Sequence, residues 1–212
     1  MLESEDRVEV VAEVDNVDDA VESCRDNPPD VVLFDVDEST AETVEDMRRL
    51  RREMPDGALV VLARREDDEE VYRAVVGGAD GHVGDGARPE ELVDTIKQAA
   101  DGDEPITRTL VERPNVARRV LETFAELAGH RSPKHRPDIS EREMRILDLA
   151  AQGMTNYQIG MSLGVSEHTV KSAISQLLAR LGLRHRTEAV VYALKSGWIG
   201  PLPAGRASEV DG

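Results

Sequence analysis

The sequence predicts an α/β domain with an open parallel sheet, followed by an all-helical domain. Over the first hundred residues, short aliphatic runs alternate with amphipathic helical patterns; beyond them only helical periodicity continues. The charge divides at the same place. Residues 1–102 hold 30 Asp and Glu against 11 Lys and Arg, whereas residues 103–212 hold 13 against 15. A length of 212 residues fits two such domains.

The first half is expected to alternate strands and helices joined by short turns. Strands are predicted at residues 8–14, 30–34, 58–62 and, weakly, 81–83. Helices are predicted at residues 16–25, 40–53, 68–76 and 89–100. This order gives a parallel sheet covered on both faces, whose ligands bind at the carboxyl ends of the strands. Asp35 lies at such an end.

Residues 155–181 (TNYQIGMSLGVSEHTVKSAISQLLARL) predict two short helices joined by a tight turn. Thr155 with Gln158 fits a capping box that begins the first helix. Gly164 ends that helix, because glycine accepts the left-handed conformation. Ser166 is the expected N-cap of the second helix.

The second of these helices has one apolar stripe and one small polar face. The stripe consists of Val170, Ile174, Leu177, Leu178 and Leu181. The opposite face centres on His168, Ser172, Ser175 and Ala179, flanked by Lys171 and Gln176. Such a helix suits the major groove of DNA. A plain helical hairpin with a solvated face is the competing interpretation, since the pattern is degenerate.

The remaining helices of the second half frame this motif. An amphipathic helix is expected at residues 115–128, then a basic tether at 129–138 that carries Arg131, Lys134 and Arg136. Ser140 with Glu143 predicts a second capping box, and Thr187 is expected to cap a last helix. The predicted domains are residues 1–102, a linker at 103–137, a helical domain at 138–200 and a disordered tail at 201–212.

Composition excludes several classes of protein. No apolar run reaches about 18 residues and no signal segment follows Met1, so a cytoplasmic protein is expected. The single Cys24 allows no intrachain disulfide and is predicted to be a small core residue. No nucleophile–base pair, metal-ligand cluster or phosphate-binding glycine loop is evident, so we expect neither an enzyme nor a cofactor.

Two stretches resemble a known family. Residues 8–100 resemble a response-regulator receiver domain. A stretch within residues 138–200 resembles the LuxR-type helix-turn-helix; its sequence is ISEREMRILDLAAQGMTNYQIGMSLGVSEHTVKSAISQLLARLGL. Together they are similar to the NarL/FixJ family of two-component transcription regulators. The resemblance implies a flavodoxin/CheY-like receiver that lacks its first strand, followed by a four-helix DNA-binding domain.

The resemblance also implies roles for individual residues. Those expected to approach base edges are Lys171, Ser172 and Ser175; those expected to bind phosphate are Thr155, Asn156, Ser166, His168 and Thr169. The last helix would dimerise through Val190, Val191 and Leu194, although burial in their own core is an equal alternative. The implied partners are promoter DNA, a second copy of the chain, and RNA polymerase or a sensor kinase, with no membrane.

Asp35 occupies the family's phospho-acceptor position, but its surroundings depart from the family pattern. The acidic pair after the first strand is missing, the hydroxyl position is Ala63, and the lysine position is Asp85. A phosphoryl group there would meet repulsion instead of a counter-charge. We therefore expect Asp35 to be a plain strand-end acid, and Mg²⁺ to bind only if Asp35 is phosphorylated.

The missing strand leaves two arrangements of the sheet. Either residues 8–14 pair directly with residues 30–34 in a four-stranded sheet, which we expect, or a gap leaves backbone groups unpaired. A start codon assigned too late is the rival explanation of the loss.

The sequence thus predicts a dimeric, sequence-specific transcription regulator whose receiver does not depend on phosphate. The acidic first half would repel DNA, so only the second half is expected to contact it. The alternatives are a conventional regulator phosphorylated on Asp35, and a protein-interaction adaptor that has lost DNA binding.

Overall fold

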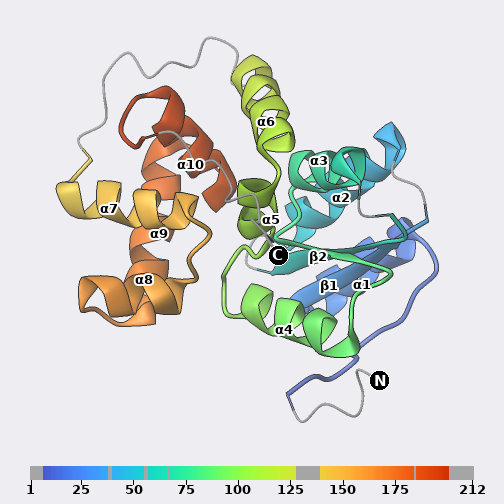
Figure 1. The fold of residues 1–212 in the computed structure, drawn as a ribbon. Coiled ribbons are helices and arrows are strands. Elements are labelled where there is room, and N and C mark those ends of the chain that lie inside the picture. The colour runs from blue at the N-terminus through green and yellow to red at the C-terminus, as the bar shows by residue number, and fades with distance from the viewer. Residues whose placement is uncertain are drawn as a thin grey trace, which may run out of the picture. The chain divides into compact units, whose positions relative to one another are not determined.

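The computed structural model describes residues 7–37, 40–54, 57–65, 67–127, 139–183 and 185–200. The chain divides into two compact units, Met1–Ile106 and Thr107–Gly212. The first is α/β and the second is helical (Figure 1).

The first unit is built on three parallel strands in the order β1-β2-β3. These are β1 (Val31–Val36), β2 (Ala58–Ala63) and β3 (Gly81–Gly84). Their register aligns Val36 of β1 with Ala63 of β2, and Ala63 with Gly84 of β3. The strands therefore end together at one carboxyl edge, as the βαβ order requires.

Four helices accompany this sheet: α1 (Val17–Asp26), α2 (Ala41–Glu53), α3 (Asp68–Gly77) and α4 (Pro89–Ala100). Helix α4 covers one face, while α2 and α3 lie on the other (Figure 1). Val31 and Leu33 pack into the cluster on the α4 side. Because side chains alternate along a strand, Val32 and Phe34 point to the opposite face.

The core on the α2 side is closely packed. A Cβ added to Gly77 of α3 would lie 2.6 Å from Cε of Met47 in α2, so the two helices meet where glycine leaves room. Cys24 is 4% exposed and its Sγ lies 3.9 Å from Sδ of Met54. Its predicted role as a small core residue is confirmed, and burial raises the pKa of its thiol.

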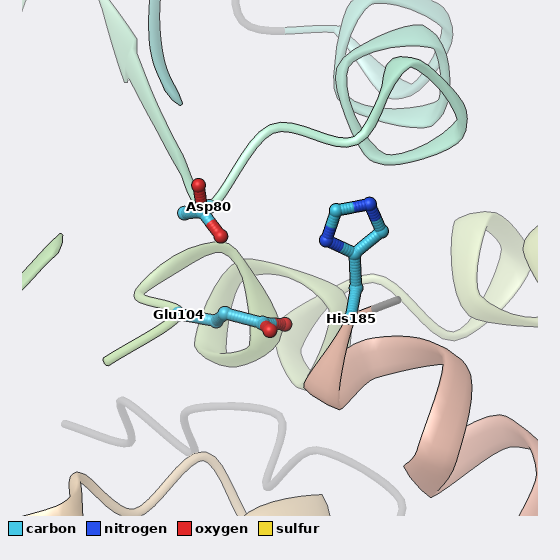
Figure 2. A group of neighbouring side chains, drawn as sticks. All are labelled: Asp80, Glu104 and His185. Carbon is cyan, nitrogen blue, oxygen red and sulfur yellow. The ribbon is translucent and has the colours of Figure 1, made fainter. Parts of the chain in front are cut away.

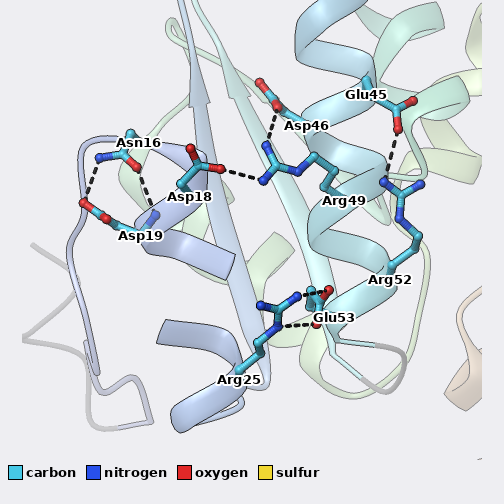
Figure 3. Close-up of polar contacts among 9 residues, drawn as sticks. All are labelled: Asn16, Asp18, Asp19, Arg25, Glu45, Asp46, Arg49, Arg52 and Glu53. Atoms are coloured by element: carbon cyan, nitrogen blue, oxygen red, sulfur yellow. Dashed lines mark hydrogen bonds and ion pairs between the residues drawn. The ribbon is translucent and has the colours of Figure 1, made fainter. Parts of the chain in front are cut away.

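Ion pairs join α1 to α2 (Figure 3). Arg49 binds Asp18 at 2.5 Å, and Arg25 binds Glu53 at 2.6 Å. The hydrogen bond from Arg25 lowers the pKa of Glu53. Arginines on these helices thus offset part of the acidic charge of this unit.

Asp80, directly before β3, forms a buried ion pair. Its Oδ2 accepts from Arg51 Nη1 at 3.0 Å and from the backbone N–H of Leu59 at 2.7 Å. A carboxylate oxygen of Glu104 lies within 4.8 Å of its own (Figure 2). Burial raises the pKa of Asp80 to about 7; Arg51 opposes that rise and Glu104 adds to it.

Six helices follow α4 in the described residues, and the first of them begins at Ile106, the last residue of the first unit. They are α5 (Ile106–Glu112), α6 (Pro114–Leu127), α7 (Glu141–Ala151), α8 (Asn156–Leu163), α9 (Glu167–Leu181) and α10 (Arg186–Lys195). One hydrophobic core joins α7, α8, α9 and α10, with Leu147, Ile159, Leu177 and Ala193 among its buried members. The fold class predicted from the sequence is confirmed.

Two local predictions were wrong, and one helix was missed. Residues 8–14 form no strand and are mostly exposed, so the sheet has three strands in the described part of the chain, not four. Their valines supply strand propensity, but a strand also needs a neighbour for its backbone groups. Helix α5 was not predicted. Its short, β-branched sequence has little helical preference, and burial of Ile106 and Leu110 stabilises it.

The second wrong prediction concerns the start of the last helix. Helix α10 begins after His185, and Thr187 lies inside its first turn. Thr187 is 5% exposed and its hydroxyl lies 3.2 Å from that of Thr107 in α5, so it binds another helix instead of capping its own.

Other predictions fall on undescribed residues. The basic tether at 129–138, with Arg131, Lys134 and Arg136, and the tail at 201–212 lie outside the described ranges. Within those ranges, none of the helices combines the length and apolarity that crossing a membrane requires.

Candidate nucleic-acid interface

The turn between α8 and α9 is held by the helix caps that the sequence predicted and by a backbone hydrogen bond that it did not. Thr155 and Gln158 form the capping box of α8, and Gly164 ends that helix with φ of 68°. The backbone N–H of Val165 donates to the carbonyl of Gly160 at 2.9 Å. The Ser166 side chain then accepts from the N–H of Thr169 and caps α9. These contacts fix the angle between the two helices.

Gly160 permits the close approach at this turn. A Cβ at this position would lie 2.7 Å from the carbonyl oxygen of Val165 and 3.3 Å from the backbone nitrogen of Glu167. Both atoms belong to the backbone and cannot rotate away. Glycine is therefore required here for space; because Gly160 stands inside a helical pattern, its neighbours in the sequence give no sign of this role.

Helix α9 buries one side and exposes the other, as predicted. Val170 is fully buried, and Ile174 and Leu177 are 8% and 1% exposed. On the opposite side His168, Lys171 and Ser175 are exposed, while Thr169 and Ser172 are half-buried. Lys171, Ser172 and Ser175, which are expected to reach base edges, therefore share one accessible face of α9, and Lys171 carries the single formal charge among them.

Helix α9 is braced from behind by α7. Arg180 binds Glu143 at 2.6 Å, and Glu143 also forms the predicted capping box with Ser140. Burial acts to raise the pKa of Glu143, but hydrogen bonds from Ser140 and the charge of Arg180 outweigh it, so that pKa lies below its ordinary value. The first turn of α7 and the last of α9 are thus tied by charge.

Asn156 does not belong to the exposed face. It is 1% exposed, and its Oδ1 accepts from Nη1 of Arg186 at 3.3 Å. Arg186 also donates to the carbonyl of Met154. The burial of Asn156 does not support its expected contact with DNA phosphate. The buried Arg186 ties α10 to the start of α8; nothing in its basic surroundings, RHR, distinguished it from a solvated arginine.

The predicted dimerisation residues are largely internal. Val190 and Val191 are 4% and 7% exposed, and Val190 belongs to the core cluster of its own chain. Leu194 is half-buried. The alternative that the sequence left open, burial in their own core, therefore describes Val190 in this structure.

The carboxyl edge of the sheet brings the receiver positions together. Asp35 is exposed near the end of β1, in register with Leu62. Ala63 is 1% exposed and accepts from the N–H of Asp85 at 2.8 Å. The acceptor, hydroxyl and lysine positions thus end adjacent strands, as the resemblance implied, and hold an acid, a methyl group and a second acid.

An arginine also stands at this edge. Arg64 follows β2 and binds Asp37 at 2.7 Å, with both side chains mostly exposed. Its charge is directed to Asp37, which stands two residues beyond the acceptor position.

Family models match both units. Residues 1–97 match the model described as "Response regulator receiver domain", and residues 138–193 match "Bacterial regulatory proteins, luxR family". The transcriptional regulatory protein LiaR of Bacillus subtilis (strain 168) is 30% identical over 192 residues, which cover 91% of this chain and 87% of LiaR.

Two further similarities extend over most of the chain. The transcriptional regulatory protein DegU of Brevibacillus brevis is 29% identical over 214 residues, covering 94% of this chain and 87% of DegU. The crystal structure of response regulator ChrA of a heme-sensing two-component system is 26% identical, covers 93% of this chain and 89% of that one, and has a TM-score of 0.40. The chain thus belongs to the NarL/FixJ family of response regulators, transcription regulators in which a receiver domain precedes a LuxR-type DNA-binding domain.

Proposed function

We propose that this regulator reads specific promoter sequences as a dimer, with α9 in the major groove, and that its receiver acts without phosphorylation. The observation that carries the first part is the outward face of α9. It offers Lys171, Ser172 and Ser175 on a helix whose other side is locked in a core. Short polar side chains on a rigid helix suit direct contact with base edges.

Phosphate contacts would come from the ends of the two helices. Thr155 caps α8 and Ser166 with Thr169 caps α9, so their hydroxyls lie where helix N-termini attract anions. His168 stands exposed in the first turn of α9. With few basic groups, one copy has little electrostatic affinity, and a dimer doubles the contact. Leu194 is the predicted dimer residue that keeps some exposed surface.

DNA reading by α9 is tested with Lys171→Ala. We expect binding to its own promoter fragments to weaken about 10- to 100-fold, the loss of one base contact. Fluorescence anisotropy with labelled duplex measures the change. Lys97→Ala, the same substitution on α4 of the acidic unit, is the matched control and should bind like the parent.

Two results would contradict this part. If Lys171→Ala bound every fragment as tightly as the parent protein, α9 would not be the reading helix. If the parent shifted no duplex even in dilute salt, the adaptor alternative would replace regulation through DNA.

We propose that the receiver acts without phosphorylation because of the residues beside Asp35 at the carboxyl edge of the sheet. Phosphoryl transfer needs a hydroxyl and a cation there, and these positions hold Ala63 and Asp85. Incubation with acetyl phosphate should leave the mass of the chain unchanged. The double variant Ala63→Thr/Asp85→Lys, which restores both groups, should accept more phosphoryl than the parent. A phosphoryl mass gain in the parent that Asp35→Asn abolishes would establish the conventional mechanism instead.

A further inference from the structure

Among the described residues of the first unit, one edge of the sheet has no neighbouring strand. We use the name β1 edge for the side of Val31–Val36 that faces away from β2. In the described part of the chain β1 pairs with β2 alone, and the order β1-β2-β3 leaves this side without a neighbouring strand. Residues 31–34 are all half-buried, whereas residues 58–61 of β2 are buried.

The β1 edge lacks the usual protection against pairing with another chain. Natural edges carry lysine, proline, a bulge or very short strands. β1 is six residues long, VVLFDV, and has none of these; its one charge is Asp35 near the end. β3, at the other edge, has only four residues, GHVG.

A second open element lies in the same chain. Residues 8–14 (VEVVAEV), here named the valine segment, are described but pair with no described strand. Val10, Val11 and Val14 are 44%, 51% and 43% exposed. Valine favours strands, and an unpaired run of strand-forming residues can add to an exposed sheet edge.

The valine segment matches the β1 edge in length and in pattern. It offers seven residues against the six of β1. In an extended conformation Val8, Val10, Ala12 and Val14 lie on one side, and Glu9, Val11 and Glu13 on the other. Added to the β1 edge, the apolar side would continue the row of Val32 and Phe34, on the face opposite α4. The two glutamates would then face the side that α4 covers only in part.

We propose that the β1 edge binds the valine segment of a second copy of this chain, and that two copies exchange these segments reciprocally. In the described part of the chain neither of these complementary surfaces has a partner strand, although only residues 15–30 separate them. Two residues after Val14, the end of the valine segment, Asn16 caps α1, and Asp18 in the first turn of that helix binds Arg49.

Reciprocal exchange closes both edges at once. A pairing of this kind is isologous, since each copy gives the same segment and the same edge, so it forms a closed dimer and not a filament. It is independent of DNA binding and of Leu194 on α10. The negative charge of each first unit opposes it, so dissolved salt should favour it.

Disulfide trapping distinguishes exchange from closure within one chain. In a Cys24→Ala background, Val11→Cys and Leu33→Cys are made as separate chains, since both positions fall on the same side of the proposed pair. They are mixed and oxidised in 1 M KCl without DNA. We expect a cross-linked dimer, seen by intact mass, well above the yield from Val11→Cys mixed with Gln152→Cys, an exposed control in the second unit.

A second cysteine pair and two substitutions of Val10 control for misfolding and for an unexpected strand register. Val10→Cys with Val32→Cys probes the opposite side of the same pair. Val10→Pro in the Val11→Cys chain should abolish the cross-link because proline removes a backbone N–H and breaks a strand, whereas Val10→Thr should keep it. Circular dichroism confirms that each chain is folded.

Two outcomes overturn the proposal. If the single chain Val11→Cys/Leu33→Cys forms only an internal disulfide and the mixed chains form none, the valine segment closes its own edge. If neither residue pair cross-links above the Gln152→Cys control, the β1 edge does not accept this segment.

Discussion

At the residue scale, the tightest constraint on the DNA-binding unit is Gly160. Replacement by alanine places a methyl group 2.7 Å from a backbone oxygen. We expect Gly160→Ala to lower the free energy of unfolding of the second unit by roughly 2–3 kcal/mol, as overpacked sites do. Urea unfolding followed by Trp198 fluorescence measures it, because Trp198 is the single tryptophan of the chain.

The matched control is Gly200→Ala, in the same unit. A Cβ there would have no atom within 4 Å. Its unfolding midpoint should equal that of the parent. An unchanged midpoint in Gly160→Ala would mean that the turn shifts freely and does not fix α9.

Arg51 sets a second constraint, through the charge of Asp80. A carboxyl whose pKa is raised in the folded state loses stabilisation as pH rises from its ordinary value of 3.8 toward about 7. Arg51→Met removes the charge that limits this rise. We expect a loss of about 3–5 kcal/mol at pH 8, where Asp80 must either stay ionised without its partner or take up a proton, and a smaller loss at pH 5.5, where Asp80 already binds a proton.

Arg52→Met is the control for this pair. Arg52 is the next residue and binds Glu45 at 3.1 Å on the surface, with both side chains about half exposed. Its loss should be below ~1 kcal/mol at both pH values. Urea midpoints by circular dichroism decide; equal losses at both pH values in Arg51→Met would contradict the role of Asp80.

At the element scale, the contact between α7 and α9 combines a helix cap with a charge. The pKa of Glu143 is lowered in the folded state, so its stabilisation is present above pH 4.5 and is lost as pH falls through the folded value. Glu143→Gln keeps the capping acceptor but loses the pair with Arg180, and should flatten this acid dependence. Glu143→Ala also loses the cap, and should cost about 1 kcal/mol more at pH 7.

Thermal unfolding of both variants between pH 3 and pH 7 measures these terms. Glu141→Gln, in the same first turn but exposed, is the control. If Glu143→Gln kept the acid dependence of the parent, another carboxyl would be responsible.

The same scale shows what sequence could and could not predict. The capping boxes at Ser140 and Thr155 follow from local residue pairs, so both were predicted correctly. The valine segment and α5 were not, because tertiary packing decides them: one lacks a partner strand, the other gains a buried face. Asn156 fits a phosphate contact by motif, but Arg186, thirty positions away, makes it internal.

At the scale of the whole molecule, charge is the dominant property. The formal net charge is −17; residues 1–102 carry −19 and residues 103–212 carry +2, and the chain has only 4 lysines beside 22 arginines. Self-repulsion of this size weakens a compact state, and salt screens it over about 3 Å at 1 M. DNA binding depends on salt in the opposite direction, because salt weakens phosphate contacts.

We therefore expect salt to change the thermal stability of the two units by different amounts. Between 0.1 and 2 M KCl the unfolding midpoint of the acidic first unit should rise by roughly 5 °C, which corresponds to about 1 kcal/mol. The transition reported by Trp198 in the nearly neutral second unit should change less. Parallel melts by circular dichroism and fluorescence compare them, and sucrose at matched osmolality is the control. A first unit insensitive to salt would contradict this balance.

The order of the sheet has a consequence for the lifetime of the receiver. β2 is the one described strand bonded on both flanks. The backbone amides of its six residues should therefore exchange with solvent more slowly than those of β1 and β3. Local unfolding of either neighbouring strand would nevertheless expose one flank of β2. In a sheet of three described strands, no second interior strand remains paired when β2 loses a neighbour. The rate at which β2 becomes exposed should therefore set how long the receiver stays folded.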